Sequence, residues 1–322
     1  MSKNNKNLEN AFKKTMKKHK GNRKAQVITI IVFGLIALGS YLFGNDFISN
    51  KEIGPVTGQL EVSYLDVGQG DAIYVKVNDY DILIDAGPRS DVENLMSQLE
   101  EKNIDDFEIV IATHPHEDHI GGMTDVLKKY NVENFYMPKV SNTTKTFEYM
   151  INAISNQGLK IKTIKDGTSI DLGSGARIDV YSPIDDAYDD FNDYSPIMKL
   201  TYGETKLMFT GDAEELAEKQ VLEKYTSSEL KSDVLKFGHH GSSTSSSEEF
   251  LNAVSPTYGV ISCGLDNKYG HPHKETLEKI KNHNIETLLA LSVWYTFATA
   301  VSWDRSTSMT LKRLERNKLL HA

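Results

Sequence analysis

The chain of 322 residues is long enough for one large α/β domain or two small ones, and its composition is that of a globular protein. Its net charge is −9, yet nine of its Lys and Arg residues lie in residues 1–50 beside only Glu9 and Asp46. The remainder is therefore strongly acidic, which excludes a general electrostatic surface for nucleic acid; such a substrate would need local attraction from bound cations. Cys263 is the single cysteine, so an intramolecular disulfide is excluded.

An uncharged, apolar run at residues 25–45 follows a basic tail at residues 1–24. Its 21 positions are enough to cross a ~30 Å hydrocarbon core as a helix. Because the Lys and Arg residues precede the run, the positive-inside rule predicts a single-pass anchor in the cell membrane, with residues 46–322 outside the cytoplasm. A cleaved signal peptide, with Ala37 and Gly39 flanking the cut, is the alternative, but the apolar run continues beyond them.

Residues 46–58 contain Gly54, Pro55 and Gly58 and read as a short linker. From residue 59 to 322, short apolar runs alternate with amphipathic segments, which predicts one layered α/β domain. Strands are predicted at 60–67, 71–77, 81–87, 107–113, 132–137, 159–164, 176–182, 197–203, 206–211, 233–238 and 257–263. Helices are predicted at 92–101 and from starts near Ile120, Thr144, Ala213, Ser247 and Lys274.

The densest group of potential metal ligands is the segment HPHEDH, which directly follows the 107–113 strand. Four candidate ligands between a buried strand and a helix start indicate a metal site, whereas a solvated charged turn is the plain alternative. His114 and His116 alternate in extended backbone, so they can share one metal, while Asp118 and His119 follow the turn and can face a second. Imidazole and carboxylate ligands suit Zn²⁺ or Mn²⁺.

The HPHEDH segment matches the HxHxDH signature of the metallo-β-lactamase superfamily, which the chain resembles. Over about residues 59–285 it is similar to the C-terminal hydrolase domain of ComEC-type competence proteins and their stand-alone, membrane-anchored relatives. The matching segments are LDVGQGDA at 65–72, LIDAG at 83–87, TGD at 210–212, LKFGHHGS at 235–242 and NKYGHP at 267–272. The resemblance implies a four-layer αββα sandwich with two divalent metals, Zn²⁺ or Mn²⁺, at one edge of the two sheets.

The same resemblance assigns roles to the remaining residues of these segments. Asp212 would bridge both metals, although a lone TGD can also cap a helix. His239 would complete the second metal site, with His240 supporting it or contacting substrate, and the adjacent pair leaves that order open. His271 would contact substrate or act as an acid, or be a loop histidine without a role.

Three further aspartates receive expected roles. Asp118 would join Asp212 in catalysis as well as in metal binding. Asp85 would support the site from its strand end, while Asp71, like Asp66, would shape the first turn rather than touch metal.

Two features depart from the family pattern. Many members supply a third histidine to the first metal, but no histidine lies between His119 and His239. Asn192 with Ser195 fits the ComEC-type pattern there, so the first site would be weaker or completed by water. After about residue 286 the chain lacks the expected Gly-Thr strand and terminal hairpin, which suggests a frameshifted or remodelled C-terminus that sequencing of the source DNA would reveal.

The resulting functional hypothesis is a phosphodiesterase of nuclease-like, ComEC type. Two metals about 3.5–4 Å apart would hold a bridging hydroxide, so no serine or cysteine nucleophile is required. The alternatives are a phosphorylcholine-type esterase of surface polymers and a non-catalytic surface or competence assembly factor. The competence channel itself is excluded because such channels have many membrane spans, whereas a single span is predicted in this chain. Antibiotic hydrolysis is a lesser alternative, because many class B β-lactamases carry cysteine where Asp212 stands.

Overall fold

The computed structural model describes residues 60–265, 267–291, 299–303 and 309–312. All of them belong to one compact unit, Val56–Ala322. The predicted tail, anchor and linker lie outside the described residues. In the described part of the chain, no helix is long and apolar enough to cross a membrane.

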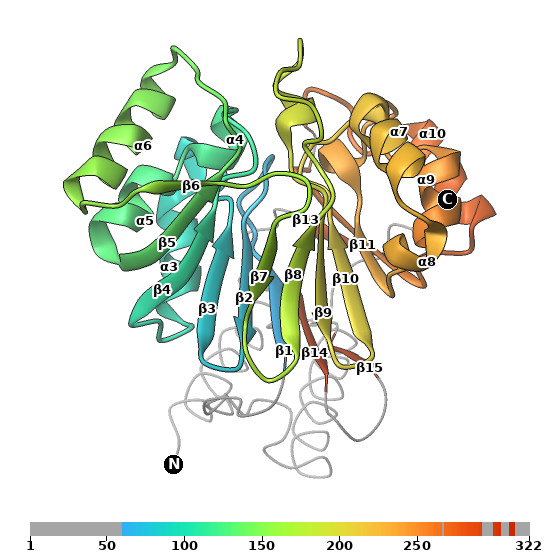
Figure 1. Ribbon diagram of the computed structural model, residues 1–322, viewed down its shortest axis with the longest axis horizontal. Helices are drawn as coiled ribbons and strands as arrows, with labels where there is room; N and C mark the ends of the chain where they lie inside the picture. The colour runs from blue at the N-terminus through green and yellow to red at the C-terminus, as the bar shows by residue number, and fades with distance from the viewer. Residues whose placement is uncertain (1–59, 266, 292–298, 304–308, 313–322) are drawn as a thin grey trace, which may run out of the picture. The chain divides into compact units, whose positions relative to one another are not determined.

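The strands form two mixed sheets that pack face to face (Figure 1). Among the described residues, the first sheet has the order β15-β14-β1-β2-β3-β4-β5-β6, and β3 to β6 are parallel. Its strands are β1 (Leu60–Tyr64), β2 (Ile73–Val77), β3 (Tyr80–Ile84), β4 (Asp106–Ile111), β5 (Asn131–Met137), β6 (Ile161–Thr163), β14 (Thr299–Trp303) and β15 (Met309–Lys312).

The second sheet has the order β13-β12-β11-β10-β9-β8-β7 among the described residues, with β10 to β13 parallel. Its strands are β7 (Ser169–Asp171), β8 (Ala176–Val180), β9 (Met198–Tyr202), β10 (Thr205–Phe209), β11 (Val234–Lys236), β12 (Tyr258–Cys263) and β13 (Glu286–Leu291).

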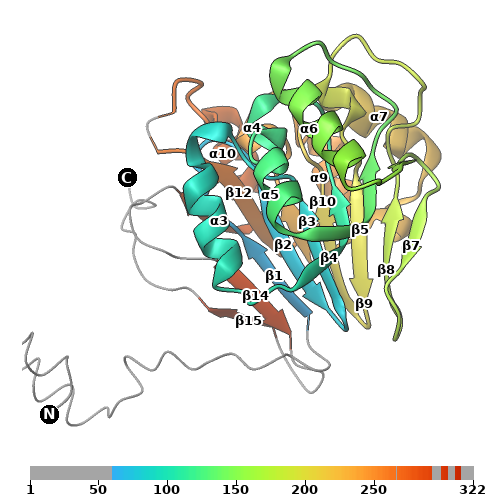
Figure 2. The same cartoon turned by 90° about the vertical axis from the view of Figure 1, so that its left-hand side faces the viewer.

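Helices cover the outer face of each sheet, which gives four layers (Figure 2). Those on the first sheet are α3 (Val92–Glu100), α4 (Glu117–Ile120), α5 (Met123–Lys129) and α6 (Lys145–Asn156). Those on the second are α7 (Glu215–Lys224), α8 (Ser227–Leu230), α9 (Glu248–Val254) and α10 (Lys274–Asn282). The 3-10 turns are η2 (Arg89–Asp91), η3 (Asn192–Tyr194) and η4 (Gly238–Gly241).

Three apolar cores hold these layers together, one between the sheets and one under each helix layer. Strand β4 shows why its sequence is a continuous apolar run. Ile109 and Ile111 lie in the core between the sheets, whereas Val110 and Ala112 lie under the helices. Since successive side chains of a strand point to opposite faces, a strand covered on both faces must be apolar throughout. The predicted four-layer sandwich is therefore confirmed for the described residues.

The predicted element boundaries need some corrections. The helix predicted near Ile120 begins at Glu117 and is followed by a separate helix, α5. Among the described elements, the prediction missed β7 and α8, which are only three and four residues long, and the C-terminal strands β13, β14 and β15.

The C-terminal segment that the sequence marked as atypical supplies strands to both sheets. Strand β13 pairs in parallel with β12, β14 pairs with β1, and β15 pairs with β14 as an antiparallel pair. The expectation that a terminal strand pair is missing is therefore wrong. The frameshift hypothesis itself stays a prediction for DNA sequencing.

Candidate metal centre

The predicted ligands lie at one edge of the sandwich, where parallel strands of both sheets end. Asp85 follows β3 and the 114–119 segment follows β4, while Asp212 follows β10 and the histidine pair 239–240 follows β11. Because neighbouring parallel strands end at the same edge of a sheet, segments that are far apart in sequence meet there.

Two glycines bring the 114–119 segment close to the loop after β3. A Cβ atom on Gly121 would lie 2.2 Å from the backbone nitrogen of Arg89, and one on Gly122 would lie 2.4 Å from the carbonyl oxygen of Ala86. No side chain fits in that space, so glycine is required at both positions. The close contact sets His119 beside Asp85.

Asp212 is the centre of the ligand cluster, and it is almost fully buried. Four imidazole Nε2 atoms surround its Oδ2 atom. The distances from Oδ2 are 3.2 Å to His119, 3.4 Å to His240, 3.8 Å to His239 and 3.9 Å to His114. Such a convergence of nitrogen donors on one carboxylate oxygen fits a site for divalent cations, with the carboxylate between them.

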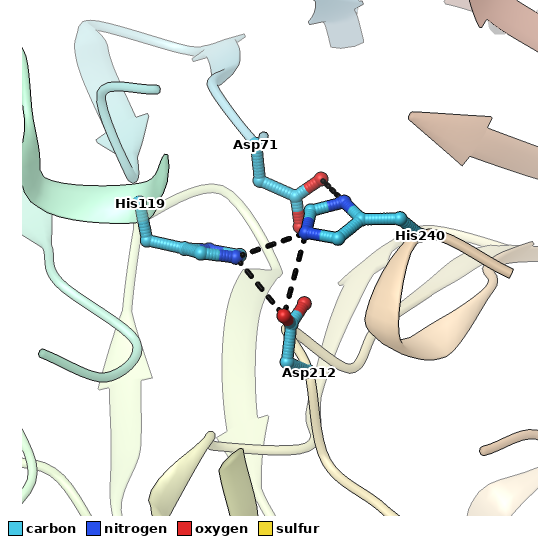
Figure 3. Close-up of side chains that lie close together, drawn as sticks. All are labelled: Asp71, His119, Asp212 and His240. Atoms are coloured by element: carbon cyan, nitrogen blue, oxygen red, sulfur yellow. Dashed lines mark hydrogen bonds and ion pairs between the residues drawn. The ribbon is translucent and has the colours of Figure 1, made fainter. Parts of the chain in front are cut away.

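The other predicted ligands extend this cluster in two directions. Asp118 Oδ2 lies 3.4 Å from His240 Nε2, and His116 Nδ1 lies 3.0 Å from His114 Nε2. Figure 3 shows the buried side of the cluster, where Asp71, His119, Asp212 and His240 each bring one donor atom within 4.8 Å of the others. The structure thus brings together every ligand predicted from the histidine and TGD motifs.

Hydrogen bonds at Nδ1, the ring nitrogen that points away from Asp212, fix the orientation of each buried ring. The Nδ1 atom lies 2.7 Å from Asp85 Oδ2 in His119 and 2.9 Å from the carbonyl oxygen of Ser262 in His240. In His114 it lies 3.1 Å from Thr113 Oγ1. These partners leave Nε2 free as a donor to a cation, and such outer partners typically orient metal-binding histidines. The predicted supporting role of Asp85 agrees with this contact.

The backbone at His239 and His240 is unusual, because both residues adopt left-handed conformations with φ of 46° and 56°. In extended backbone two consecutive side chains would point to opposite sides. Here both Nε2 atoms lie within 3.8 Å of the same Asp212 oxygen. Left-handed conformations at non-glycine residues cost roughly 1–3 kcal/mol each and cluster at functional sites. The strain therefore marks this turn as part of the centre.

Burial and charge act against each other on the titration of this cluster. Burial raises the pKa of Asp212, but His119 and His240 outweigh it and hold that pKa well below its usual range. Burial lowers the pKa of His240, but Asp212 and Asp118 outweigh it and hold that pKa well above its usual range. Cation binding must therefore release protons, so the affinity for cations falls as the pH is lowered.

Asn192 and His271 lie beside the cluster. Asn192 is buried, and its Nδ2 atom donates to Glu214 Oε1 at 3.3 Å, while the same oxygen lies 3.0 Å from His239 Nδ1. Asn192 thus reaches His239 through Glu214. The ring of His271 packs 5.5 Å from His239 and 6.2 Å from His240, and burial together with His239 lowers its pKa to about 4. At neutral pH it is uncharged, which does not suit a proton donor.

Sequence reasoning missed three side chains that hold the centre. Lys236 is fully buried in β11, Glu214 lies against His239, and Glu218 is fully buried under the serine-rich loop. Lys236 had a visible signal, since a charged residue stands within a buried apolar strand. The two glutamates look like ordinary helix residues in the sequence and gave no such signal.

Glu218 fixes the loop that follows the histidine pair. Its two carboxylate oxygens accept the backbone N–H groups of Ser246 and Ser247 at 2.6 and 2.8 Å. The hydroxyl oxygen of Ser246 in turn accepts a hydrogen bond from the N–H of Gly238, next to His239. Burial raises the pKa of Glu218 to about 7, although these N–H donors oppose the rise.

This shift predicts a pH-dependent stability. Between the ordinary pKa of 4.5 and about 7, folded Glu218 keeps a proton that the unfolded chain releases, so the free energy of unfolding falls as the pH rises. The free energy of unfolding of wild type, taken relative to that of Glu218→Gln, should fall by up to about 3 kcal/mol across this pH window. Urea unfolding of both proteins at several pH values measures it. An advantage that stays constant or grows with pH would contradict the assignment.

The chain is similar to one protein family and to several known proteins. A family model described as the metallo-beta-lactamase superfamily matches residues 65–265. The chain is 31% identical to ComE operon protein 3 of Bacillus subtilis over 246 residues, which are 71% of this chain and 31% of that protein. It is 28% identical to the competence protein ComA of Neisseria gonorrhoeae over 249 residues, 75% of this chain and 32% of that protein.

The chain thus spans less than a third of the length of these two relatives. Among solved structures, the metallo-beta-lactamase fold protein YhfI from Bacillus subtilis matches with a TM-score of 0.50 and 12% identity. The match covers 77% of this chain and 100% of YhfI. At that identity the likeness concerns the fold alone.

Proposed function

Because this chain belongs to the metallo-beta-lactamase superfamily, we propose that it is a phosphodiesterase with two divalent cations, Zn²⁺ or Mn²⁺, around Asp212. The observation that carries the proposal is the convergence of four imidazole Nε2 atoms on Asp212 Oδ2. The competence relatives of ComEC type agree with a metal-dependent hydrolase fold. The residues around Asp212 would hold two divalent cations, which would supply the charge stabilisation that an in-line displacement at a phosphoester needs.

The donor set divides into two groups that share Asp212. His114 and His116 lie together and would hold the first cation, while Asp118, His119 and His240 would hold the second. When bound, the cations would supply an activated water and stabilise the charge that develops on the phosphoryl oxygens.

His239 completes the first donor group in this proposal, and Asn192 supports it from outside the group. His239 Nε2 faces Asp212 from the side of Glu214. It therefore takes the place of the third histidine that many family members carry between the positions of His119 and His239. Asn192 supports it through Glu214 and does not replace it as a ligand. The ordering of the pair predicted from the sequence is therefore revised: His240 and His239 would both bind, one to each cation.

The chain's own residues orient these donors. Asp85 keeps the His119 ring in the tautomer with a free Nε2. His271, uncharged at neutral pH and packed on His239 and His240, would contact the substrate rather than deliver a proton.

A phosphorylcholine-type substrate is the second candidate, and the residues beside His116 favour it. The Phe191 ring lies 5.9 Å from the His116 ring, and the segment before it carries exposed Asp185, Asp186, Asp189 and Asp190. An aromatic face and carboxylates attract a quaternary ammonium group. The same carboxylates repel a polyanion, so nucleic acid would be held mainly by the cations, with a shallow dependence of binding on salt.

A substrate panel tests the proposal and separates its alternatives. Protein loaded with Zn²⁺ or Mn²⁺ is assayed on bis(p-nitrophenyl) phosphate, p-nitrophenyl phosphorylcholine, single- and double-stranded DNA, and nitrocefin. We expect cleavage of phosphoesters that is abolished by a chelator. If the metal-loaded protein cleaves none of the phosphoesters, the proposal fails, and the non-catalytic assembly factor becomes the better reading.

A further inference from the structure

Lys236 and Asp71 form an ion pair at the buried side of the metal centre. Lys236 is 0% exposed and Asp71 is 1% exposed, and the Lys236 ammonium contacts Asp71 Oδ2 directly. Lys236 ends β11 in the second sheet, whereas Asp71 precedes β2 in the first. The pair therefore joins the two sheets where the ligands meet.

The Lys236 ammonium also reaches the TGD turn. It donates to the carbonyl oxygen of Gly211 at 2.9 Å and lies 3.9 Å from Asp212 Oδ1. This Oδ1 atom is buried and makes no hydrogen bond within the described part of the chain. The ammonium is thus the charge that faces Oδ1, while Oδ2 faces the imidazoles.

Asp71 connects the pair to two other predicted ligands. Its Oδ1 atom lies 3.6 Å from His240 Nδ1, and its backbone N–H donates to the carbonyl oxygen of Asp118 at 3.2 Å. By position alone, Asp71 is also close enough to the other donors to serve as a metal ligand (Figure 3). The Lys236 ammonium already neutralises it, so the lysine occupies the place that a further cation would need.

Stability does not explain a pair buried this deeply. Removing two charges from water is costly, and replacing a buried ion pair with apolar residues of similar volume is often neutral or stabilising. The pair has instead a direct electrostatic effect on Asp212, because the ammonium attracts Oδ1 and fixes the turn that carries it.

We propose that Lys236, held in place by Asp71, is a positioning residue that turns Asp212 so that Oδ2 faces both cations. This inference rests on the proposed function, since it needs cations at Asp212. It assigns Asp71 an indirect role and not that of a metal ligand.

The test is the Zn²⁺ affinity of the full chain carrying Asp71→Asn together with Lys236→Met. This double variant removes both charges with little change in volume, and so avoids leaving one buried charge unpaired. We expect a folded protein whose Zn²⁺ affinity, measured by competition with a chelator, falls by about 10–100-fold, the range typical of outer partners of metal ligands. The matched control is Glu61→Gln with Lys102→Met, which removes a largely buried pair between β1 and the turn after α3 and should leave the affinity unchanged.

The outcomes separate the two proposals. Wild type that binds no Zn²⁺ would refute the proposed function, and the positioning role with it. Wild type that binds two Zn²⁺ ions, beside a double variant of equal affinity, would overturn the positioning role alone. If the double variant does not fold, Asp71→Asn alone is titrated with Zn²⁺. In that variant Lys236 can still donate to the carbonyl oxygen of Gly211, but it has lost its ion pair with Asp71. A loss of at least about threefold supports the positioning role, and an unchanged affinity overturns it.

Discussion

We expect the Asp212→Asn variant to lose phosphodiester cleavage by more than about 100-fold, beyond the loss typical of an outer partner. The reason is geometric, since four imidazole Nε2 atoms approach the Asp212 Oδ2 atom. An amide in its place carries no charge and presents a donor nitrogen or a weaker oxygen to the cations. Both cation positions should therefore weaken together.

Steady-state kinetics on bis(p-nitrophenyl) phosphate at saturating Zn²⁺ measures this effect. The matched control is Asp179→Asn, which changes an aspartate that binds Ser169 and Arg177 at the far strand β8. It should cleave like wild type. An Asp212→Asn enzyme that turns over as fast as wild type would show that the Asp212 carboxylate is not needed for cleavage.

The second large effect is expected for His240→Ala, in contrast to the milder role that the sequence suggested. His240 is 1% exposed, and its Nε2 atom lies 3.4 Å from both Asp118 Oδ2 and Asp212 Oδ2. Its loss should empty the second cation position and lower turnover by more than about 100-fold. His239→Ala should cost less, about 10-fold, because the His239 side chain is 25% exposed and water can replace it.

Metal content and kinetics of both variants test this order. His283→Ala is the control, since His283 binds Glu248 at the surface, away from the ligands. If His239→Ala proved the more damaging change, the assignment of the two histidines to the two positions would have to be reversed. If both variants kept the activity of wild type, neither the His239 ring nor the His240 ring would be a metal ligand.

The part of the site that could be predicted from sequence is the part encoded in short segments at strand ends. HPHEDH and TGD each follow an apolar run, so the sequence places each of them at the end of a strand. Because β4 and β10 belong to different sheets, their meeting at one edge of the sandwich was implied by the family resemblance and not by the strand pattern. The alternation of apolar strands with amphipathic helices predicts a layered α/β domain, whereas the four-layer αββα sandwich was implied by the resemblance to the metallo-β-lactamase superfamily.

What escaped prediction depends on backbone geometry and on contacts across the two sheets. The positions of His239 and His240 depend on two left-handed residues that no local rule for histidine predicts. The pairing of Asp71 with Lys236 joins segments 165 residues apart in sequence. Strand β13 was missed because its unusual sequence was read as a departure from the family pattern, although it pairs with β12 along its whole length.

The central claim is that two divalent cations bind around Asp212, and elemental analysis of the purified full chain tests it most directly. The protein is loaded with Zn²⁺, dialysed against buffer without chelator, and its zinc content is compared with that of Asp212→Asn. The geometry predicts two zinc ions per chain in wild type, and at most one weakly held ion in the variant. Wild type with no stoichiometric zinc, or a variant that retains both ions, would contradict the account.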